Sequence, residues 1–323
     1  MRLVGIFLSL LAMAALPGGF GGAAHAEGTA PTKILLAFEG GAGRPLAFHL
    51  AERMREALGR PVIVEERPGA SGRIAAVALK NATADGKTLA LLPIAVPVLM
   101  PMTFKDVSYN AVHDFSPISQ IATYGFAFAV PNSHPARSFP EFVDWLKTHP
   151  SQAFYGTGAA GSLPHFLGVM IAKATGTNMT HVAYKGYGPM SLDLAEGTIP
   201  AGISVISDLI EMHRAGRIRI LATSGGSRQP LLPEVPTFAE QGYPMVQASG
   251  WVGVFAPAKT PKAVIDEWSA ALAAAVRSPQ TRQKLFELGL DPTGTTPEEF
   301  AAIVTTDIAR WSPIIQKSGF RAD

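Results

Sequence analysis

The sequence KILLAFEGGAGRP, residues 33–45, joins an apolar run typical of a buried strand to a glycine-rich turn. A helix is expected over Pro45–Leu58, because proline stands at its first position and Gly59 just past its end. Backbone N–H groups at a helix start have no partner within the helix, and the helix dipole adds partial positive charge there. Arg44 adds a full positive charge. The turn Gly40–Arg44 is therefore predicted to hold a small anion.

The segments around this turn alternate between strand and helix patterns. Strands are expected over 33–38, 61–65 and 88–92, and helices over 45–58 and 74–81. The links between them are short, and the link Arg67–Gly72 is again rich in small residues. This order predicts a parallel sheet covered by helices, and so an α/β fold.

A second series of the same kind follows a long apolar strand pattern over 118–130. Strands are expected over 153–155, 181–183, 203–206 and 218–222, and helices over 139–147, 164–175, 188–196 and 209–215. A strand over 251–256 then returns toward the first series, and helices follow over 261–277, 279–288 and 297–318. The pattern predicts two lobes, each a mainly parallel sheet flanked by helices. Lobe 1 comprises 27–124 and 251–323, lobe 2 comprises 125–250, and the two chain crossings form a hinge.

A glycine-rich turn in the second lobe has the same character as the first one. Residues 156–162 read GTGAAGS, and a helix is expected directly afterwards. Ligands of open α/β sheets bind beyond the carboxyl ends of the strands, so both turns are expected to line a cleft between the lobes. The predicted ligand-binding residues are Gly40, Gly41, Ala42, Gly43, Arg44, Ser71, Thr157, Gly158, Gly161, Ser162, His165 and Lys185. Main-chain N–H groups are expected to do most of the holding, with hydroxyl contacts from Ser71, Thr157 and Ser162.

Three polar side chains have structural interpretations as well. His165 is expected in the first turn of a helix, where a ligand contact and a capping or packing role fit the sequence equally well. Lys185 is either an anion contact or a solvated loop lysine. Asp208 is interpreted as the cap of the helix expected from Leu209.

The composition excludes several classes of site. The chain has no cysteine, so disulfides, thiol catalysis and cysteine metal sites are ruled out. Its 8 histidines lack metal-ligand spacing, and its glycine turns match neither the Walker loop nor the dinucleotide fingerprint. No metal and no cofactor are therefore predicted. A net charge of +2 gives no nucleic-acid footprint.

The N-terminal 26 residues have the pattern of a signal peptide. Arg2 gives a positive start, Leu3–Leu16 is an apolar core, and Ala24-His25-Ala26 is a small-x-small cleavage pattern. The mature chain is expected to begin at Glu27, after export. The predicted location is the periplasm.

Five ordered motifs resemble those of the Bug receptors, the periplasmic solute-binding components of tripartite tricarboxylate transporters. They are PVIVEERPGASG (61–72), DGKTL (85–89), YGTGAAGS with His165 (155–165), HVAYKG (181–186) and LPEVPT (232–237). The resemblance covers essentially the whole mature chain. It implies a two-lobed periplasmic-binding fold, type II-like, that closes on a small carboxylate.

The first turn departs from the family pattern. Where the family has Thr and Asp, this chain has Gly43 and Arg44, and where the family has Arg, four residues further on, it has Phe48. One hypothesis is that Arg44 contacts a carboxylate directly and that Phe48 accompanies a more apolar ligand. The alternative is that Arg44 pairs with Glu39 and never touches the ligand.

The sequence thus predicts an extracytoplasmic solute receptor and not an enzyme. It would capture a small organic acid by hinge closure and deliver it to a membrane transporter. It is expected to act as a monomer and to have no nucleic-acid partner. One alternative is a ligand-loaded sensory partner of a membrane kinase. The other is a periplasmic enzyme acting on a carboxylated substrate in the same cleft, although no nucleophile–base pair is visible in the sequence.

Overall fold

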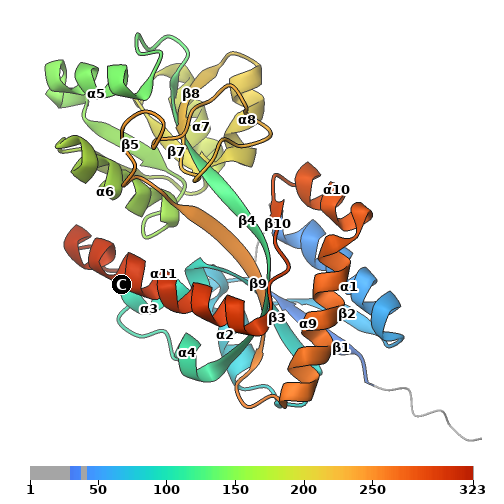
Figure 1. Cartoon of the computed structure of the whole chain (residues 1–323). Coiled ribbons are helices and arrows are strands. Elements are labelled where there is room, and N and C mark those ends of the chain that lie inside the picture. The colour runs from blue at the N-terminus through green and yellow to red at the C-terminus, as the bar shows by residue number, and fades with distance from the viewer. Residues whose placement is uncertain (1–29, 38–41, 323) are drawn as a thin grey trace, which may run out of the picture.

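The computed structural model describes residues 30–37 and 42–322. These residues build two lobes, one above the other in Figure 1, and two long strands connect the lobes. The expected signal peptide (1–26) and the turn residues Gly40 and Gly41 lie outside the described residues. The two-lobed α/β fold predicted from the sequence is confirmed.

The first lobe contains three parallel strands. β1 (Thr32–Leu36) lies between β2 (Val62–Glu66) and β3 (Thr88–Pro93). The other elements of this lobe are α1 (Gly43–Leu58), η1 (Ala70–Gly72), α2 (Arg73–Lys80), η2 (Ala95–Leu99), α3 (Met100–Thr103), α4 (Ala111–Asp114), α9 (Lys262–Arg277), α10 (Pro279–Glu287), β10 (Asp291–Pro292) and α11 (Pro297–Ser318). Because each parallel strand is followed by a helical segment, three such segments begin at one edge of the sheet.

The second lobe repeats this arrangement. β5 (Phe154–Thr157) lies between β6 (Thr180–Ala183) and β7 (Gly202–Val205), and the three strands are parallel. The other elements are α5 (Phe139–Thr148), η3 (Pro150–Gln152), α6 (Leu163–Thr175), α7 (Tyr187–Glu196), α8 (Ile206–Arg214) and β8 (Ile218–Thr223). The helices α6, α7 and α8 follow β5, β6 and β7 in turn, so they too begin at a common edge.

Two long antiparallel strands form the connection between the lobes (Figure 1). β4 (Phe115–Pro131) pairs with β9 (Ser249–Pro257) and then continues into the second lobe, where it pairs with β7 and β8. Tyr124 and Gly250 face each other across this pair, and a Cβ on Gly250 would lie 2.2 Å from the Tyr124 ring. Only glycine leaves room for the ring there. The lobe boundaries at 124/125 and 250/251 fall in these strands and stay a proposal.

Helices cover both faces of each sheet. In the first lobe, α1 and α9 bury Leu50 and Trp268 on one face, while α2 and α11 bury Leu79 and Phe300 on the other. In the second lobe, α7 and α8 cover one face and α5 and α6 the other. No helix of the described chain is both long enough and apolar enough to cross a membrane.

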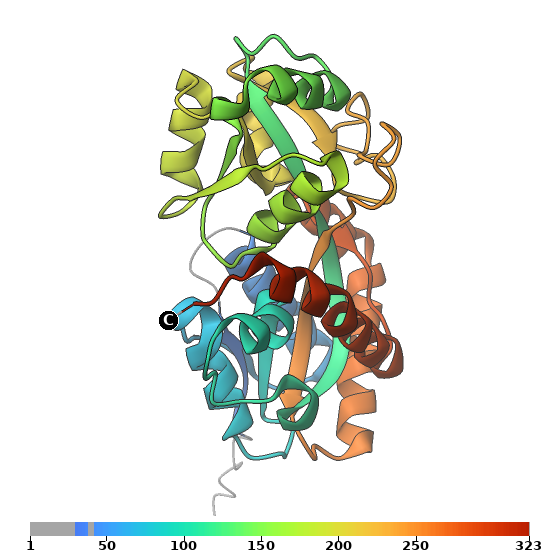
Figure 2. The ribbon, with the colours of Figure 1, turned by 90° about the vertical axis from the view of Figure 1, so that its left-hand side faces the viewer.

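The C-terminal segment belongs to the first lobe but also contacts the second. The N–H of Ala322 donates to the carbonyl of Thr103 at 2.8 Å, which ties the segment to α3. The Phe320 ring lies against Gly161, where a Cβ would come within 2.6 Å of it, and edge-on to His165. Figure 2 shows the end of α11 beneath α6 at the junction of the lobes. This contact bridges the lobes on one side of the hinge strands.

Candidate functional site

The carboxyl ends of the first-lobe strands meet at one place. A Cβ on Gly72, in the segment after β2, would lie 2.8 Å from Val96 and 3.2 Å from the Cβ of Ala37 at the end of β1. Ala70 and Ser71 have positive φ values of 46° and 57°. Left-handed backbone at non-glycine residues is strained, and such strain concentrates at functional sites.

The second-lobe turns also contact one another. The N–H of Gly186, after β6, donates to the carbonyl of Gly158, after β5, at 2.8 Å. A Cβ on Gly158 would lie 3.1 Å from the Tyr187 nitrogen, so this glycine permits the close approach. Ala159 and Ala160 are exposed, and their N–H groups donate to no described residue. These main-chain groups are available to a ligand.

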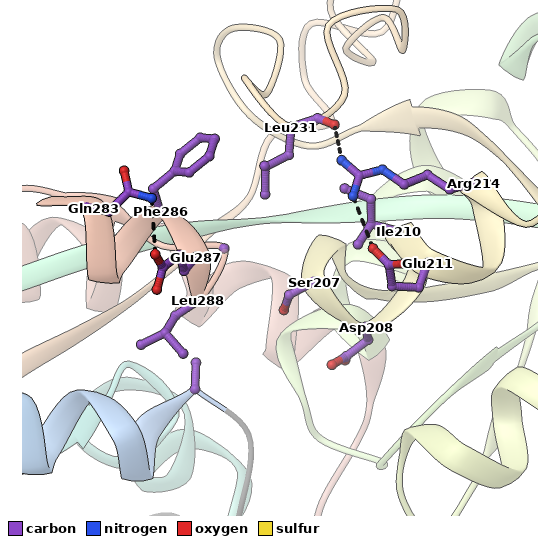
Figure 3. A pocket seen from close by; sticks show the side chains of 12 residues that line it. Ser207, Asp208, Ile210, Glu211, Arg214, Leu231, Gln283, Phe286, Glu287 and Leu288 are labelled. Carbon is purple, nitrogen blue, oxygen red and sulfur yellow. Dashed lines mark hydrogen bonds and ion pairs between the residues drawn. The ribbon is translucent and has the colours of Figure 1, made fainter.

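A cleft of about 510 Å³ lies between the lobes. It is lined by Ala42, Gln283, Phe286, Glu287, Leu288 and Gly289 from the first lobe, and by Ser207, Asp208, Ile210, Glu211, Arg214 and Leu231 from the second. Figure 3 shows Ser207 and Asp208 on the side of α8 that faces Leu288. The lobes touch at one edge of the cleft. There, a Cβ added to Gly289 would lie 3.0 Å from the Cβ of Ser207.

Two helix N-termini from opposite lobes reach this cleft. Ala42 is the N-cap residue of α1, and it provides no side-chain cap. Ser207 lies in the first turn of α8, whose N-cap residue Val205 also provides none. The first turn of α1 holds no acidic residue. The N-terminal ends of α1 and α8 therefore bring partial positive charge to the cleft, whose lining also carries the carboxylates of Asp208, Glu211 and Glu287.

Among the titratable side chains that line the cleft, Asp208 is the one with a shifted pKa. Burial raises the pKa of its carboxyl above the usual range, although the Ser204 hydroxyl, which donates to Oδ2 at 2.6 Å, acts in the opposite direction. Burial and the nearby charge of Asp208 raise the pKa of Tyr124 and Tyr187. Asp208, at the start of α8, thus interacts electrostatically with Tyr124 in the hinge strand β4 and with Tyr187 at the start of α7.

The interpretation of Asp208 as a helix cap is wrong. α8 begins at Ile206 rather than Leu209, so Asp208 falls inside the first turn, and the N-cap residue is Val205. The apolar run Ile203–Ile206 hid the boundary, because the last residues of the expected strand already belong to the helix. An acidic residue is common in the first turn of a helix, so Ser207 and Asp208, two and three residues past the end of β7, were the sequence signal that the helix begins before Leu209.

The hydroxyls predicted in the second glycine turn are occupied within the protein. Thr157 is fully buried, and its Oγ1 contacts the carbonyl of Ala159 at 3.0 Å and Nε2 of His181 at 2.7 Å. The Ser162 hydroxyl donates to the same carbonyl at 2.7 Å and accepts from the N–H of His165 as the cap of α6. Their contacts with a ligand stay a prediction, because no residue of the turn 156–162 is among those that line the cleft of about 510 Å³.

His165 is packed inside the second lobe. Its Nδ1 accepts from the Gly161 N–H at 3.1 Å, and its ring stacks on His181 with the centroids 3.9 Å apart. Burial lowers the pKa of His165 to about 4, and burial together with His165 lowers the pKa of His181 to about 4. Both rings are therefore neutral at pH 7.

The cations predicted for the site lie outside the cleft lining. Arg44 donates to Glu66 at 2.7 Å, and its guanidinium lies 5.4 Å from the ring centroid of exposed Phe48. Lys185 is exposed and forms no ion pair with the described residues. Arg44 is thus engaged by a residue that neither hypothesis named, whereas Glu39 lies outside the described residues. Ligand contacts of Arg44 and Lys185 stay predictions.

Comparison with known proteins places this architecture in a family. The model of the "Tripartite tricarboxylate transporter family receptor" matches residues 46–320. The protein BugT of Bordetella pertussis is 28% identical over 321 residues, which cover 99% of this chain and 97% of BugT.

Solved structures extend the likeness to ligand complexes. Rpa4515 of R. palustris with adipate has a TM-score of 0.79 and 30% identity, covering 90% of this chain and 98% of that one. MatC from Rhodopseudomonas palustris with bound malate has a TM-score of 0.74 and 25% identity, covering 88% and 98%. The resemblance to Bug receptors seen in the sequence motifs is confirmed.

Proposed function

The chain belongs to the tripartite tricarboxylate transporter family of receptors, and on that premise we propose that its two lobes close around a small carboxylate and deliver it to membrane transport subunits. The observation that carries the proposal is the cleft lined from opposite lobes by Ala42, the N-cap residue of α1, and by Ser207, in the first turn of α8. A carboxylate between them interacts with both dipoles only when the lobes are together. Differential affinity of this kind drives closure.

The relatives support the class of solute. Rpa4515 is described with adipate and MatC with malate, which are both small dicarboxylates. We extend this chemistry to the present cleft, where the first turns of two helices meet and the lining cation, Arg214, is already paired with Glu211. The exported state also belongs to the proposal, with a signal peptide cleaved near Ala26 and a monomeric receptor in the periplasm. Its support is the Arg2 to Ala26 pattern and the likeness to a solved structure described as the periplasmic binding protein BugD.

A catalytic role is not part of the proposal. The hydroxyl–imidazole pair formed by Thr157 and His181 has a distance of 2.7 Å, which suits a nucleophile and its base. Thr157 is fully buried, however, so a substrate has no access to its hydroxyl. Among the described residues, no carboxylate forms a hydrogen bond with either partner to orient the imidazole.

The test has two parts: a screen of small carboxylates for binding, and a substitution that adds a negative charge at the N-terminus of α1. A ligand at a hundredfold excess over Kd stabilises the folded state by about 2.7 kcal/mol, which a thermal-shift assay detects. Ala42→Asp places a carboxylate at the N-cap of α1. There it takes the proposed position of the ligand carboxylate and interacts favourably with the helix dipole. We expect this variant to keep its stability and to bind the carboxylate at least tenfold more weakly.

Ala42→Asn is the matched control, because asparagine caps a helix as well as aspartate but carries no charge. It is expected to reduce affinity far less than Ala42→Asp. The proposal fails if no small carboxylate stabilises the wild-type protein. The role of α1 fails if both substitutions leave affinity unchanged.

A further inference from the structure

Asp208 is the one charged side chain of the cleft lining without an ion-pair partner in the described part of the chain. Glu211 pairs with Arg214 at 3.1 Å, and Glu287 accepts from Gln283 at 3.1 Å and lies 3.8 Å from Lys284. Figure 3 shows the Glu211–Arg214 pair set apart from Asp208. The described partner of Asp208 is a neutral hydroxyl, that of Ser204.

This arrangement is unfavourable in a cleft that takes an anion. Asp208 is half-buried, and its burial raises the cost of carrying charge, as its elevated pKa indicates. Its titratable neighbours from β4 and α7 are the phenols of Tyr124 and Tyr187, which bring no positive charge. A purely anionic ligand would meet an uncompensated like charge beside its seat.

We propose that Asp208 binds a positively charged nitrogen of the solute, so that the solute carries an ammonium group beside its carboxylate. The helix N-termini of α1 and α8 then hold the carboxylate, and Asp208 holds the ammonium at the same cleft. The charge on Asp208 is compensated when the solute enters. This inference rests on the proposed function and narrows its ligand to zwitterionic carboxylates.

A structural role is the competing explanation. An acidic residue in the first turn of α8 interacts favourably with the helix dipole, and Ser204 fixes its orientation. Replacement of Asp208 would then lower stability without changing which solutes bind. The two explanations therefore differ in ligand selectivity, which a binding experiment measures directly.

The experiment uses matched pairs of solutes that differ by one ammonium group. L-Glutamate is compared with glutarate, L-aspartate with succinate, and the other L-amino acids with their desamino acids, by thermal shift and then by calorimetry. The wild-type protein should bind the zwitterion of at least one pair tenfold or more tightly than its partner. Asp208→Asn should lose most of that preference, and it should bind the desamino acid at least as tightly as the wild type does, because the like charge beside the carboxylate is gone.

Asp144→Asn is the control, since this exposed residue of α5 makes the same change of charge outside the cleft lining. It should leave the preference intact, and urea unfolding should show that both variants fold. Binding of desamino acids alone, or a preference that survives Asp208→Asn, overturns the inference and leaves the proposed function standing. Binding of no carboxylate of either kind overturns both.

Discussion

Gly168 lies on α6 where the helix packs directly on a tyrosine. A Cβ on Gly168 would lie 2.1 Å from the ring of Tyr155, which is buried and donates its hydroxyl to the carbonyl of His165 at 2.8 Å. Alanine normally stabilises a helix interior by about 1 kcal/mol relative to glycine. Here we expect Gly168→Ala to destabilise the protein by about 1–3 kcal/mol, because the ring has to move within a packed core. Urea unfolding measures the difference.

Gly188 provides the comparison within the same lobe. It lies in the first turn of α7, directly before Pro189, and apart from its two chain neighbours no heavy atom would come within 4 Å of an added Cβ. Gly188→Ala should therefore change the stability by no more than about 0.5 kcal/mol, because the gain in helix propensity is offset by the crowding of an alanine before proline. A gain of stability at Gly168 would contradict the packing argument.

Residue roles were less predictable than residue positions. The sequence placed Thr157 in the glycine-rich turn and Ser162 and His165 at the start of the following helix. Thr157 is the last residue of β5, while Ser162 is the N-cap residue of α6 and His165 lies in its first turn. It could not show that their polar atoms contact Ala159, Gly161 and His181, because such contacts depend on the path of the turn. Asp208 was missed as a cleft residue for a similar reason, since the start of α8 decides which way its side chain faces.

The predicted helix boundaries agree with the structure where the sequence carries clear capping residues. α11 spans Pro297–Ser318 as predicted, because Thr296 and Glu299 form a capping box at its start and Gly319 ends it in a left-handed conformation. α8 begins three residues earlier than predicted, since Val205 gives no cap signal. Apolar strands followed by apolar helix starts are the cases that periodicity alone leaves open.

The stacked pair of His181 in β6 and His165 in α6 should make the stability of the protein depend on pH. His165 and His181 each have a pKa lowered by burial to about 4, against about 6.5 in an unfolded chain. Between these values the unfolded chain binds protons that the folded protein does not. The free energy of unfolding contributed by this pair is fully present above pH 6.5 and is lost as the pH falls toward 4.

The measurement compares urea unfolding at pH 7.5 and pH 5.0. His181→Gln keeps a polar group beside Thr157 and removes one titrating ring, so its loss of stability between the two pH values should be smaller than that of the wild type. His113→Gln, at an exposed position of α4, is the control. Equal losses in wild type and His181→Gln would show that the buried pair does not govern this pH range.

At the scale of the whole molecule, the two lobes were predictable and their contacts were not. Parallel strands followed by helices specify each lobe, and the long runs that became β4 and β9 specify the crossings. The contacts of Ser207 with Gly289 and of Gly161 with Phe320 join residues more than 80 positions apart. Such pairs leave no periodic signal, so they emerge only from the packed structure.

Phe320 is the side chain by which the C-terminal segment holds the second lobe. Its ring lies 5.1 Å from the His165 ring centroid and 6.0 Å from that of Phe166, while Arg321 donates to the carbonyl of Met102 in the first lobe at 3.1 Å. Contacts of this kind contribute about 0.5–1.5 kcal/mol, and they are lost when the lobes separate. Phe320→Ala should therefore shift the ligand-free protein toward an open arrangement.

Two measurements follow from this shift. The radius of gyration of the ligand-free variant, from small-angle X-ray scattering, should exceed that of the wild type, and the two should converge when ligand is saturating. Affinity should fall by about two- to tenfold, because closure has to supply the free energy that the Phe320 contact provided. Val112→Ala, at an exposed apolar position of α4, should change neither quantity. If Phe320→Ala lowers the unfolding free energy but leaves scattering and affinity unchanged, the ring stabilises the fold without controlling how the lobes close.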